Sequence, residues 1–137
     1  MSCKSLIDVA TTTTTSVLAN ATLPLTTIVR RRGQDVNLSG NTVAITDCGS
    51  NYYLVSITAT FTAPVAGIVT LNLQQNGVNV VGATASTTIT TATTEVRSLS
   101  FSTIVRTFNN VGIDTLSILN AGVAVSFSNI SMEVEKL

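Results

Sequence analysis

The sequence predicts an all-β protein, an antiparallel β-sandwich of about eight to ten strands. Apolar or small residues alternate with mostly hydroxylic ones over residues 53–63, and this period of two places successive side chains on opposite faces of a strand. Asn76-Gly77 supplies two residues that accept a positive φ, as a tight type I′ hairpin turn requires, and valines follow at the same spacing. No segment long enough for an amphipathic helix repeats its apolar residues with a helical period.

The remaining strands follow from the same alternation and from the turn residues between them. Ser39-Gly40-Asn41 predicts a turn that joins two short strands, and Gly82 predicts a bulge or bend within a long one. The expected strands cover residues 23–32, 36–38, 43–45, 53–63, 69–74, 95–108, 115–119 and 123–137, and a further strand begins at Val78 within the segment 78–96, which is rich in small and β-branched residues. Their apolar sides predict a core formed by Val55, Ile57, Phe61, Leu71, Leu73, Leu99, Phe101, Val125 and Phe127.

The composition is unusually poor in charge and favours association. Charged residues make up 10% of the chain, the net charge is zero and the mean hydropathy is +0.46, whereas ordinary soluble domains carry about 25% charged residues. No apolar run approaches the roughly 20 residues of a membrane-spanning helix, so we expect no membrane partner. We expect an oligomer, with a monomer covered by neutral Ser, Thr and Asn as the alternative.

A change in composition divides the 137 residues at residue 22. Residues 1–22 contain a run of five threonines and no apolar segment of the length of a secretory signal, which predicts synthesis in a cytoplasm. We therefore expect Cys3 and Cys48 to be reduced, with a disulfide between them as the alternative. We interpret residues 1–22 as an extended arm that docks on another subunit or a scaffold, with a disordered tail as the alternative, and residues 23–137 as the sandwich domain. The arm side chains expected to contact the partner are Ser2, Cys3, Leu6, Ile7, Val9, Val17 and Leu18.

The order of the elements resembles that of a known family. A first strand is followed by a small hairpin, by Gly49-Ser50-Asn51-Tyr52-Tyr53 at the entry to a long strand, by the Asn76-Gly77 hairpin and by an apolar last strand. Over residues 23–137 this order resembles the tumour-necrosis-factor-like jelly roll, the fold of complement globular heads. The resemblance implies jelly-roll topology and a compact homotrimer in which one sheet of each subunit packs around a threefold axis.

The chain is also similar to small Thr-, Ser- and Asn-rich proteins of bacteriophages and prophages, through residues 1–5 and through Ile-Val-Arg-Arg at residues 28–31. This resemblance implies a virion structural protein, a capsid decoration or head fibre protein that its arm attaches to the major capsid protein or another virion protein. The implied location is the virion, after synthesis in the cytoplasm of the bacterial host. The scarcity of aromatic residues, 4% of the chain, argues against a cytokine-like receptor role.

The inventory of reactive side chains predicts no enzyme, no cofactor and no metal site. The chain has no His, and its seven carboxylates are scattered. Glu133 and Glu135 share one face of the last strand, where exposed carboxylates are usually just solvated. In the charge run at residues 30–32, alternation places Arg31 on the opposite face from the other two arginines. We expect these arginines to pair with carboxylates across strands or subunits, and we expect no nucleic-acid partner.

The polar faces of the strands are the expected contacts between subunits. The candidate interface residues are Tyr52, Leu54, Asn72, Gln74, Ser98, Ser100 and Ser126. A carbohydrate- or host-surface-binding adhesin is the alternative function, because jelly rolls host lectins. In that case Tyr52 is the candidate contact to a host-surface glycan.

Overall fold

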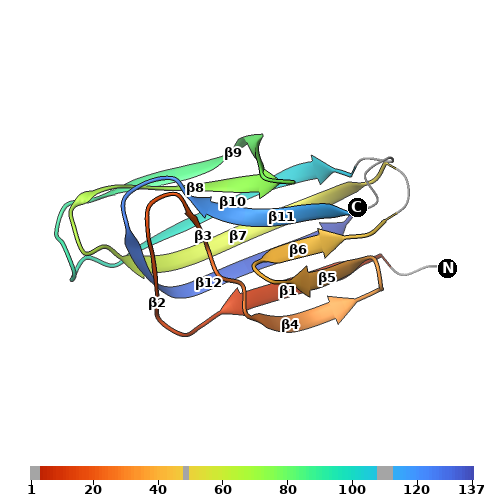
Figure 1. Ribbon diagram of the computed structural model, residues 1–137, viewed down its shortest axis with the longest axis horizontal. Helices are drawn as coiled ribbons and strands as arrows, with labels where there is room; N and C mark the ends of the chain where they lie inside the picture. The colour runs from red at the N-terminus through yellow and green to blue at the C-terminus, as the bar shows by residue number, and fades with distance from the viewer. Residues whose placement is uncertain (1–3, 48–49, 108–112) are drawn as a thin grey trace.

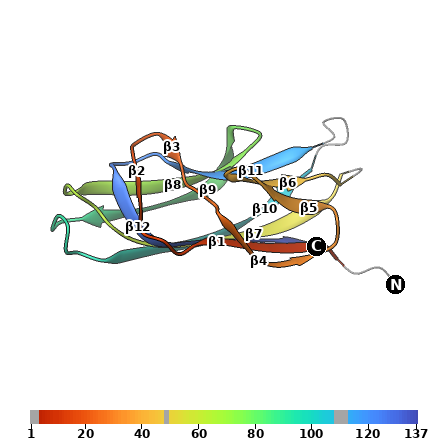
Figure 2. The ribbon, with the colours of Figure 1, turned by 60° about the horizontal axis from the view of Figure 1, so that its bottom comes forward.

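Two antiparallel sheets pack face to face, as Figures 1 and 2 show. The computed structural model describes residues 4–47, 50–107 and 113–137, and every regular element within them is a strand. Sheet A runs in the order β10 (Arg97–Arg106), β7 (Tyr52–Thr62), β12 (Val125–Lys136), β1 (Leu6–Thr11) and β4 (Thr27–Arg32), and β2 (Thr15–Val17) also pairs with β12. Sheet B runs in the order β5 (Val36–Ser39), β6 (Thr42–Ile45), β11 (Asp114–Asn120), β8 (Gly67–Gln75) and β9 (Val78–Ile89), and β3 (Ala21–Thr22) also pairs with β11. The predicted antiparallel sandwich is confirmed.

The core lies between the sheets and consists of the inward half of each alternating strand. Along β7, every second side chain from Tyr53 to Phe61 has at most 1% of its surface exposed. Phe61 meets Phe127 of β12 edge to face, with ring centroids 5.6 Å apart, an arrangement that aromatic pairs prefer. The predicted core side chains are all buried except Phe101, which is half-buried against the same core.

The predicted Asn76-Gly77 turn joins β8 to β9 with a positive φ at both residues, 55° and 80°. The Asn76 side chain also reaches the neighbouring strand β11. Its Oδ1 accepts from the backbone N–H of Thr115 at 2.9 Å, and its Nδ2 donates to Asp114 Oδ1 at 2.8 Å. The turn residue therefore fixes the tip of the hairpin to the rest of sheet B as well as reversing the chain.

Residues 6–22 are part of the sandwich, so the predicted division into an arm and a domain at residue 22 is wrong for them. β1 lies between β12 and β4 and pairs with both. Ile7 and Val9 are fully buried, and β2 carries Val17 into the same core. Burial of these side chains stabilises the sandwich itself. Ser2, Cys3 and Cys48 lie outside the described residues.

The predicted strand over residues 23–32 is shorter than expected and begins at Thr27, as β4. Pro24 has no N–H to donate to a sheet. Around it, side-chain bonds replace the sheet hydrogen bonds: Thr11 Oγ1 donates to the Pro24 carbonyl at 2.7 Å, and the N–H of Thr26 donates to Thr11 Oγ1 at 3.2 Å. The segment before β4 is therefore held to β1 without being a strand.

Asn120, at the end of β11, links the N-terminal segment to the rest of the molecule through side-chain hydrogen bonds. Its side chain is fully buried, and Nδ2 donates to the carbonyls of Val17, Leu18 and Val123 at 3.3, 3.2 and 2.9 Å. These are carbonyls from two separate loops, so one amide joins the connection after β2 to the connection before β12.

Replacing Asn120 with Ala should lower the free energy of unfolding by about 2–3 kcal/mol, because three carbonyl groups lose their donor in a site that water reaches poorly. Denaturant titration followed by circular dichroism measures the change. Asn37→Ala, on the exposed side of β5, is the matched control and should cost less than about 0.5 kcal/mol. Equal losses in the two variants would show that the Asn120 amide does not hold these loops together.

Candidate assembly interface

The outer face of sheet A is a broad surface of small polar side chains. Along β7 the positions that alternate with the core are Ser56, Thr58 and Thr60. The strand register places Thr58 directly opposite Ser100 of β10 and Ser131 of β12. Short hydroxylic side chains lose little conformational entropy when they are covered. This part of the face is therefore suited both to water and to a polar partner.

The charges of this face gather on β1, β4 and β12. Asp8 of β1 lies opposite Glu133 of β12 on one side and Arg30 of β4 on the other, and Glu135 follows Glu133 on the same face. The ion pairs within the described residues lie elsewhere, so these three carboxylates have no cationic partner there. Asp8 Oδ1 is buried and accepts no hydrogen bond. Adjacent like charges and an unsatisfied buried oxygen both destabilise the isolated chain.

The three consecutive arginines divide between two faces, as predicted. Arg31 lies opposite the buried Ile7, away from Arg30 and Arg32. Arg32 Nε donates to the backbone carbonyl of Lys4 at 2.7 Å. None of the three forms an ion pair within the described residues, so the expected pairing across strands is not found; pairing between subunits stays a prediction.

Five of the predicted interface residues share the outer face of sheet A, and two lie elsewhere. The five are Tyr52, Leu54, Ser98, Ser100 and Ser126. Asn72 and Gln74 belong to β8 in sheet B, where Asn72 Oδ1 accepts from Thr84 at 2.8 Å and Gln74 Nε2 donates to Asn79 at 3.0 Å. The period of two predicts on which side of a strand a residue lies, but it does not predict which sheet the strand joins.

Three of the five predicted arm residues that the structure describes have no surface with which to bind a partner. Ile7, Val9 and Val17 are core residues, so their predicted role as anchors is wrong. Leu6 is half-buried on the outer face of sheet A. Leu18 alone among the described arm residues is largely exposed, at 72%.

The sequence did not predict that Asp8 lies beside Glu133 or that Arg30 lies on the other side of Asp8. The period of two identifies Glu133 and Glu135 as neighbours on one face. Their other neighbours depend on the pairing of β12 with β1 and of β1 with β4, strands distant in sequence. No local pattern carries that information.

A depression of about 340 Å³ opens at the end of the sandwich where β7 finishes. Ser16, Ser126 and Thr62 lie opposite one another across β2, β12 and β7 and border it with three hydroxyl groups, while Leu18 forms part of its apolar wall. Among the described residues, no ionisable side chain lines this depression. Its polar lining is therefore uncharged.

The loop between β9 and β10, at the rim of this depression, is organised by one carboxylate. Glu95 Oε1 accepts from the N–H groups of Thr90 and Thr91 at 3.2 and 3.0 Å, and Oε2 lies 2.7 Å from Arg97 Nε. The bond from Arg97, and then those from Thr90 and Thr91, lower the pKa of Glu95 from 4.5 to about 2. The same loop holds Thr93 at φ 67°, a conformation that strains a β-branched residue.

The opposite end of the sandwich is closed by a buried tyrosine. The Tyr53 hydroxyl donates to Asp47 Oδ2 at 2.8 Å, and Lys136 Nζ lies 2.9 Å from the same oxygen. Burial, followed by the bond to Asp47, raises the pKa of Tyr53 above its ordinary value. The hydroxyl therefore stays protonated, and the Asp47 carboxylate joins the loop before β7 both to β7 and to the end of β12.

Within residues 4–47, 50–107 and 113–137, no three Cys, Asp or Glu side chains gather closely enough to hold a metal ion. The same part of the chain has no helix that is long and apolar enough to cross a membrane.

No protein-family model matches the chain, and no curated protein matches its sequence. Solved structures match its fold over nearly the whole length. Murine APRIL at pH 5.0 aligns with a TM-score of 0.69 and 15% identity, over 98% of this chain and 100% of that chain. PRD1 vertex protein P5 aligns with a TM-score of 0.58 and 13% identity, over 99% and 98%. The globular domain of zebrafish complement 1qA aligns with a TM-score of 0.61 and 9% identity, over 94% of each.

These neighbours are jelly rolls of the tumour-necrosis-factor-like kind, so the predicted fold and the predicted resemblance are confirmed. The alignments begin well before residue 23, which agrees with the inclusion of β1 in the sandwich. At these identities the likeness concerns the fold alone.

The Glu95 loop should make part of the stability depend on pH. Because the pKa of Glu95 is lower in the folded chain, its contribution is present above pH 4.5 and is lost as the pH falls towards 2. Thermal unfolding across this window should show a smaller fall in Tm for Glu95→Gln than for the unmodified protein. The same fall in both proteins would contradict this assignment of the carboxylate. Asp35→Asn, which changes another carboxylate, is the control.

Proposed function

We propose that this protein is a structural component of a bacteriophage particle, a capsid decoration or head fibre protein that works as a homotrimer. Its work is association and needs no catalysis, cofactor, metal, nucleic acid or membrane. The location that follows is the virion, after synthesis in the bacterial cytoplasm.

The observation that carries the proposal is the outer face of sheet A. It is five strands wide, nearly uncharged over β7 and β10, and acidic over β1 and β12. Asp8, Glu133 and Glu135 lack cations within the described chain, while Arg30 and Arg32 stand on the edge strand β4. A second copy offers polar side chains to the neutral part of this face, and the arginines of its β4 to the acidic part. A face of this kind is suited to contact between copies.

The comparisons support a particle protein at the level of the fold. PRD1 vertex protein P5, a phage protein, shares the fold over 99% of this chain. Murine APRIL and zebrafish complement 1qA share the same fold. The assignment to a phage therefore rests on the vertex protein and on the resemblance of residues 1–5 and 28–31 to phage and prophage proteins. Attachment through residues 6–22 is not part of the proposal, because those residues are built into the sandwich.

A carbohydrate-binding adhesin is the second candidate, and the uncharged depression at the end of β7 favours it. Its row of hydroxyls from Ser16, Ser126 and Thr62 suits a neutral sugar, whereas Tyr52 lies at the other end of β7. A glycan array with the purified protein tests this second function. Binding that is lost in Ser126→Val and kept in Tyr52→Ala would favour it.

Light scattering of the purified protein should give a mass of about 43 kDa, three times the chain mass of 14.3 kDa. Mass spectrometry of purified particles from the strain that encodes it should find the chain among their proteins. A monomer in solution, or particles that lack the chain, would refute the proposal.

Reversing one acidic charge of the face should weaken the trimer. Glu133→Lys places a cation beside Asp8 and removes an attraction for the arginines of another copy, so the fraction of trimer at micromolar concentration should fall and should become sensitive to salt. Asn37→Lys, on the outer side of sheet B, adds a cation away from this face and should leave the trimer unchanged. Identical masses for the two variants would exclude the acidic part of this face from the contact.

A further inference from the structure

The depression at the end of β7 has the composition of a small-ligand site. Such sites have volumes of about 300–1,000 Å³ and combine mostly apolar walls with a few placed polar groups. At about 340 Å³ this depression has room for one sugar ring, and four of its lining residues carry hydroxyl groups. The other lining residues are apolar: Val17, Leu18, Ala63, Pro64, Ala124 and Val125.

Three of the hydroxyl groups are available to a ligand. Ser16, Ser126 and Thr62 stand opposite one another on three neighbouring strands, and we call these three residues the hydroxyl row. Within the described residues, no hydrogen bond involves any of their side chains. A hydroxyl group donates one hydrogen bond and accepts others, so the hydroxyl row can serve both a donor and an acceptor of the same ligand.

A strained residue borders the same depression. Thr93 lines it and has a φ of 67°, a conformation that is costly for a β-branched residue and persists only where its surroundings impose it. Here the N–H of Thr93 donates to the Ala63 carbonyl at 2.8 Å and holds the β9–β10 loop against the end of β7. Backbone strain of this kind clusters at ligand sites.

The other walls of the depression are also fixed. The connection after β2 contributes Leu18 and the connection before β12 contributes Ala124. The buried amide of Asn120 joins these two connections through the carbonyls of Leu18 and Val123. A site whose walls are held in place before binding loses little conformational entropy when a ligand enters.

The electrostatics of the depression favour a neutral ligand. Its described lining contains no ionisable side chain. Glu95 and Arg97 of the adjoining loop pair with each other at 2.7 Å. A charged ligand would lose its hydration here without gaining a partner, which costs free energy.

The mixture of apolar and hydroxyl lining selects among neutral sugars. A plain hexose carries hydroxyl groups around its ring, and those that face the apolar walls would be left without hydrogen bonds. An acetamido group combines a methyl group with an amide N–H and C=O. Its methyl group suits a wall such as Leu18 and Pro64, and its amide suits the hydroxyl row.

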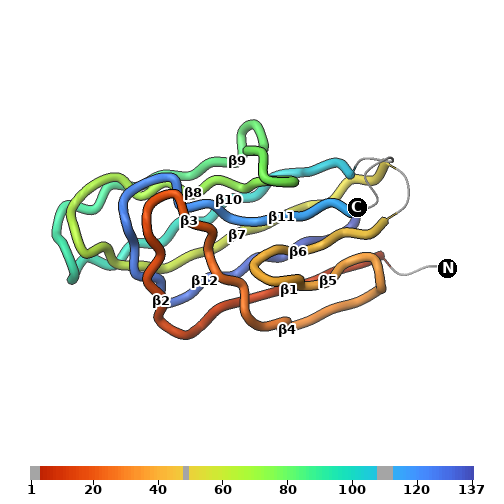
Figure 3. The backbone as a smooth tube through the Cα atoms, in the orientation of Figure 1, coloured from red at the N-terminus to blue at the C-terminus, as the bar shows by residue number. Residues whose placement is uncertain are grey.

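The depression lies at the end of the sandwich away from the C-terminus. Figure 3 shows the β7–β8 and β9–β10 loops at that end, opposite the label of the C-terminus. β1 begins near the C-terminus as well, because Leu6 pairs with Glu135. A ligand can therefore reach the depression when the other end of the sandwich faces a particle.

We propose that this depression binds a neutral 2-acetamido hexose of a host-surface glycan. The acetyl methyl group contacts Leu18 and Pro64, and the amide bonds to the hydroxyl row. The inference rests on the second of the two proposed functions and names its ligand; it requires neither the trimer nor a place in the virion.

Ligand-observed NMR with the full chain and free sugars tests the site. N-acetylglucosamine or N-acetylgalactosamine should bind with a Kd on the order of millimolar, as expected for a single sugar, with the strongest saturation at the acetyl methyl protons. Glucose and galactose should bind about tenfold more weakly, because they lack the acetamido group. Equal binding of acetylated and plain sugars would refute the role of the acetyl group, and no binding by any of the four would refute the site.

Two variants test the residues that carry the inference. Ser126→Val removes one hydroxyl group of the row and should weaken binding about tenfold. Ser39→Val, on the exposed side of β5, is the matched control and should bind as the unmodified protein does. Thr93→Gly should raise Tm, because glycine adopts a positive φ without strain, and should weaken binding several-fold, because the loop is no longer held in one conformation.

Equal binding by Ser126→Val and Ser39→Val would exclude the hydroxyl row from the site. A higher Tm with unchanged binding in Thr93→Gly would show that the strain does not serve the ligand. Light scattering of the same samples separates this inference from the proposed assembly. A monomer that binds the sugar would refute the trimer and retain the site, whereas a trimer that binds none of the sugars would do the reverse.

Discussion

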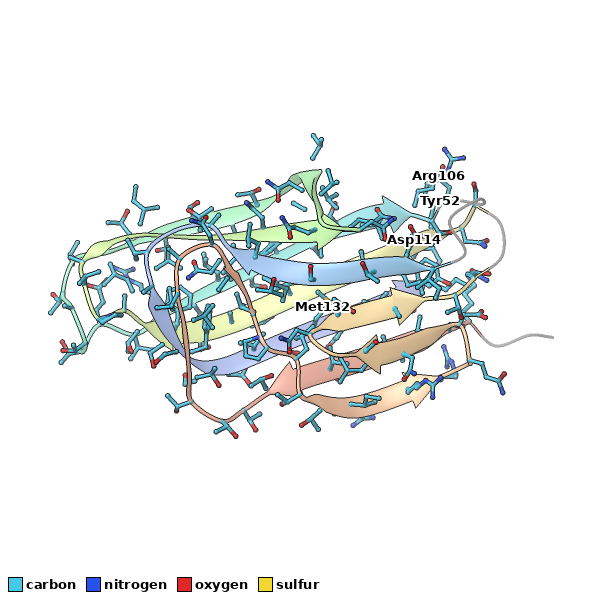
Figure 4. All side chains as sticks on the ribbon, viewed as in Figure 1. Tyr52, Arg106, Asp114 and Met132 are labelled. Atoms are coloured by element: carbon cyan, nitrogen blue, oxygen red, sulfur yellow. The ribbon has the colours of Figure 1, made fainter. Side chains whose placement is uncertain are left out.

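The pairing of β12 with both β7 and β1 is the constraint on which the rest of the structure depends. β12 consists of the twelve residues that precede Leu137, and it is the middle strand of sheet A. β12 holds β7 over ten register pairs and β1 over six, and its buried side chains Ile130, Met132 and Val134 lie in the core between the sheets. Figure 4 labels Met132 near the middle of the sandwich. Because β12 is central, the beginning and the end of the chain become neighbours, and the acidic surface at Asp8 and Glu133 arises from that contact.

The parts of the fold that the sequence predicts are those set by local rules. The alternation in β7 and the positive φ of Asn76-Gly77 are properties of a few adjacent residues, and the structure confirms both. The position of β1 is different. Ile7 and Val9 alternate with Asp8 and Ala10, but the alternation is short and runs into the threonines, so residues 1–22 read as an arm. Only the pairing with β12 and β4, which is non-local, makes this segment a strand.

The sequence predicted the chemical composition of the surface, but it did not predict which surface residues lie next to one another. A chain with 10% charged residues and a zero net charge has to cover its core with Ser, Thr and Asn, and the outer face of sheet A carries them on β7 and β10. Which charges stand together follows from strand order: Arg30, Asp8 and Glu133 lie side by side although more than a hundred residues separate the first from the last. The exposed valines of β9 escaped prediction for a related reason. A period-two pattern shows which residues share a face, but a bulge changes the phase in the middle of the strand.

The bulge in β9 also bears on the kind of assembly that this sandwich can form. A long, uncharged edge strand invites another strand to add to the sheet, which leads to open-ended aggregation. In β9 the projection at residues 80–83 interrupts the straight edge, so a second strand cannot pair along its full length. Val78 and Val81 are exposed beside this interruption, at 68% and 98%. The interrupted edge therefore disfavours open-ended strand addition.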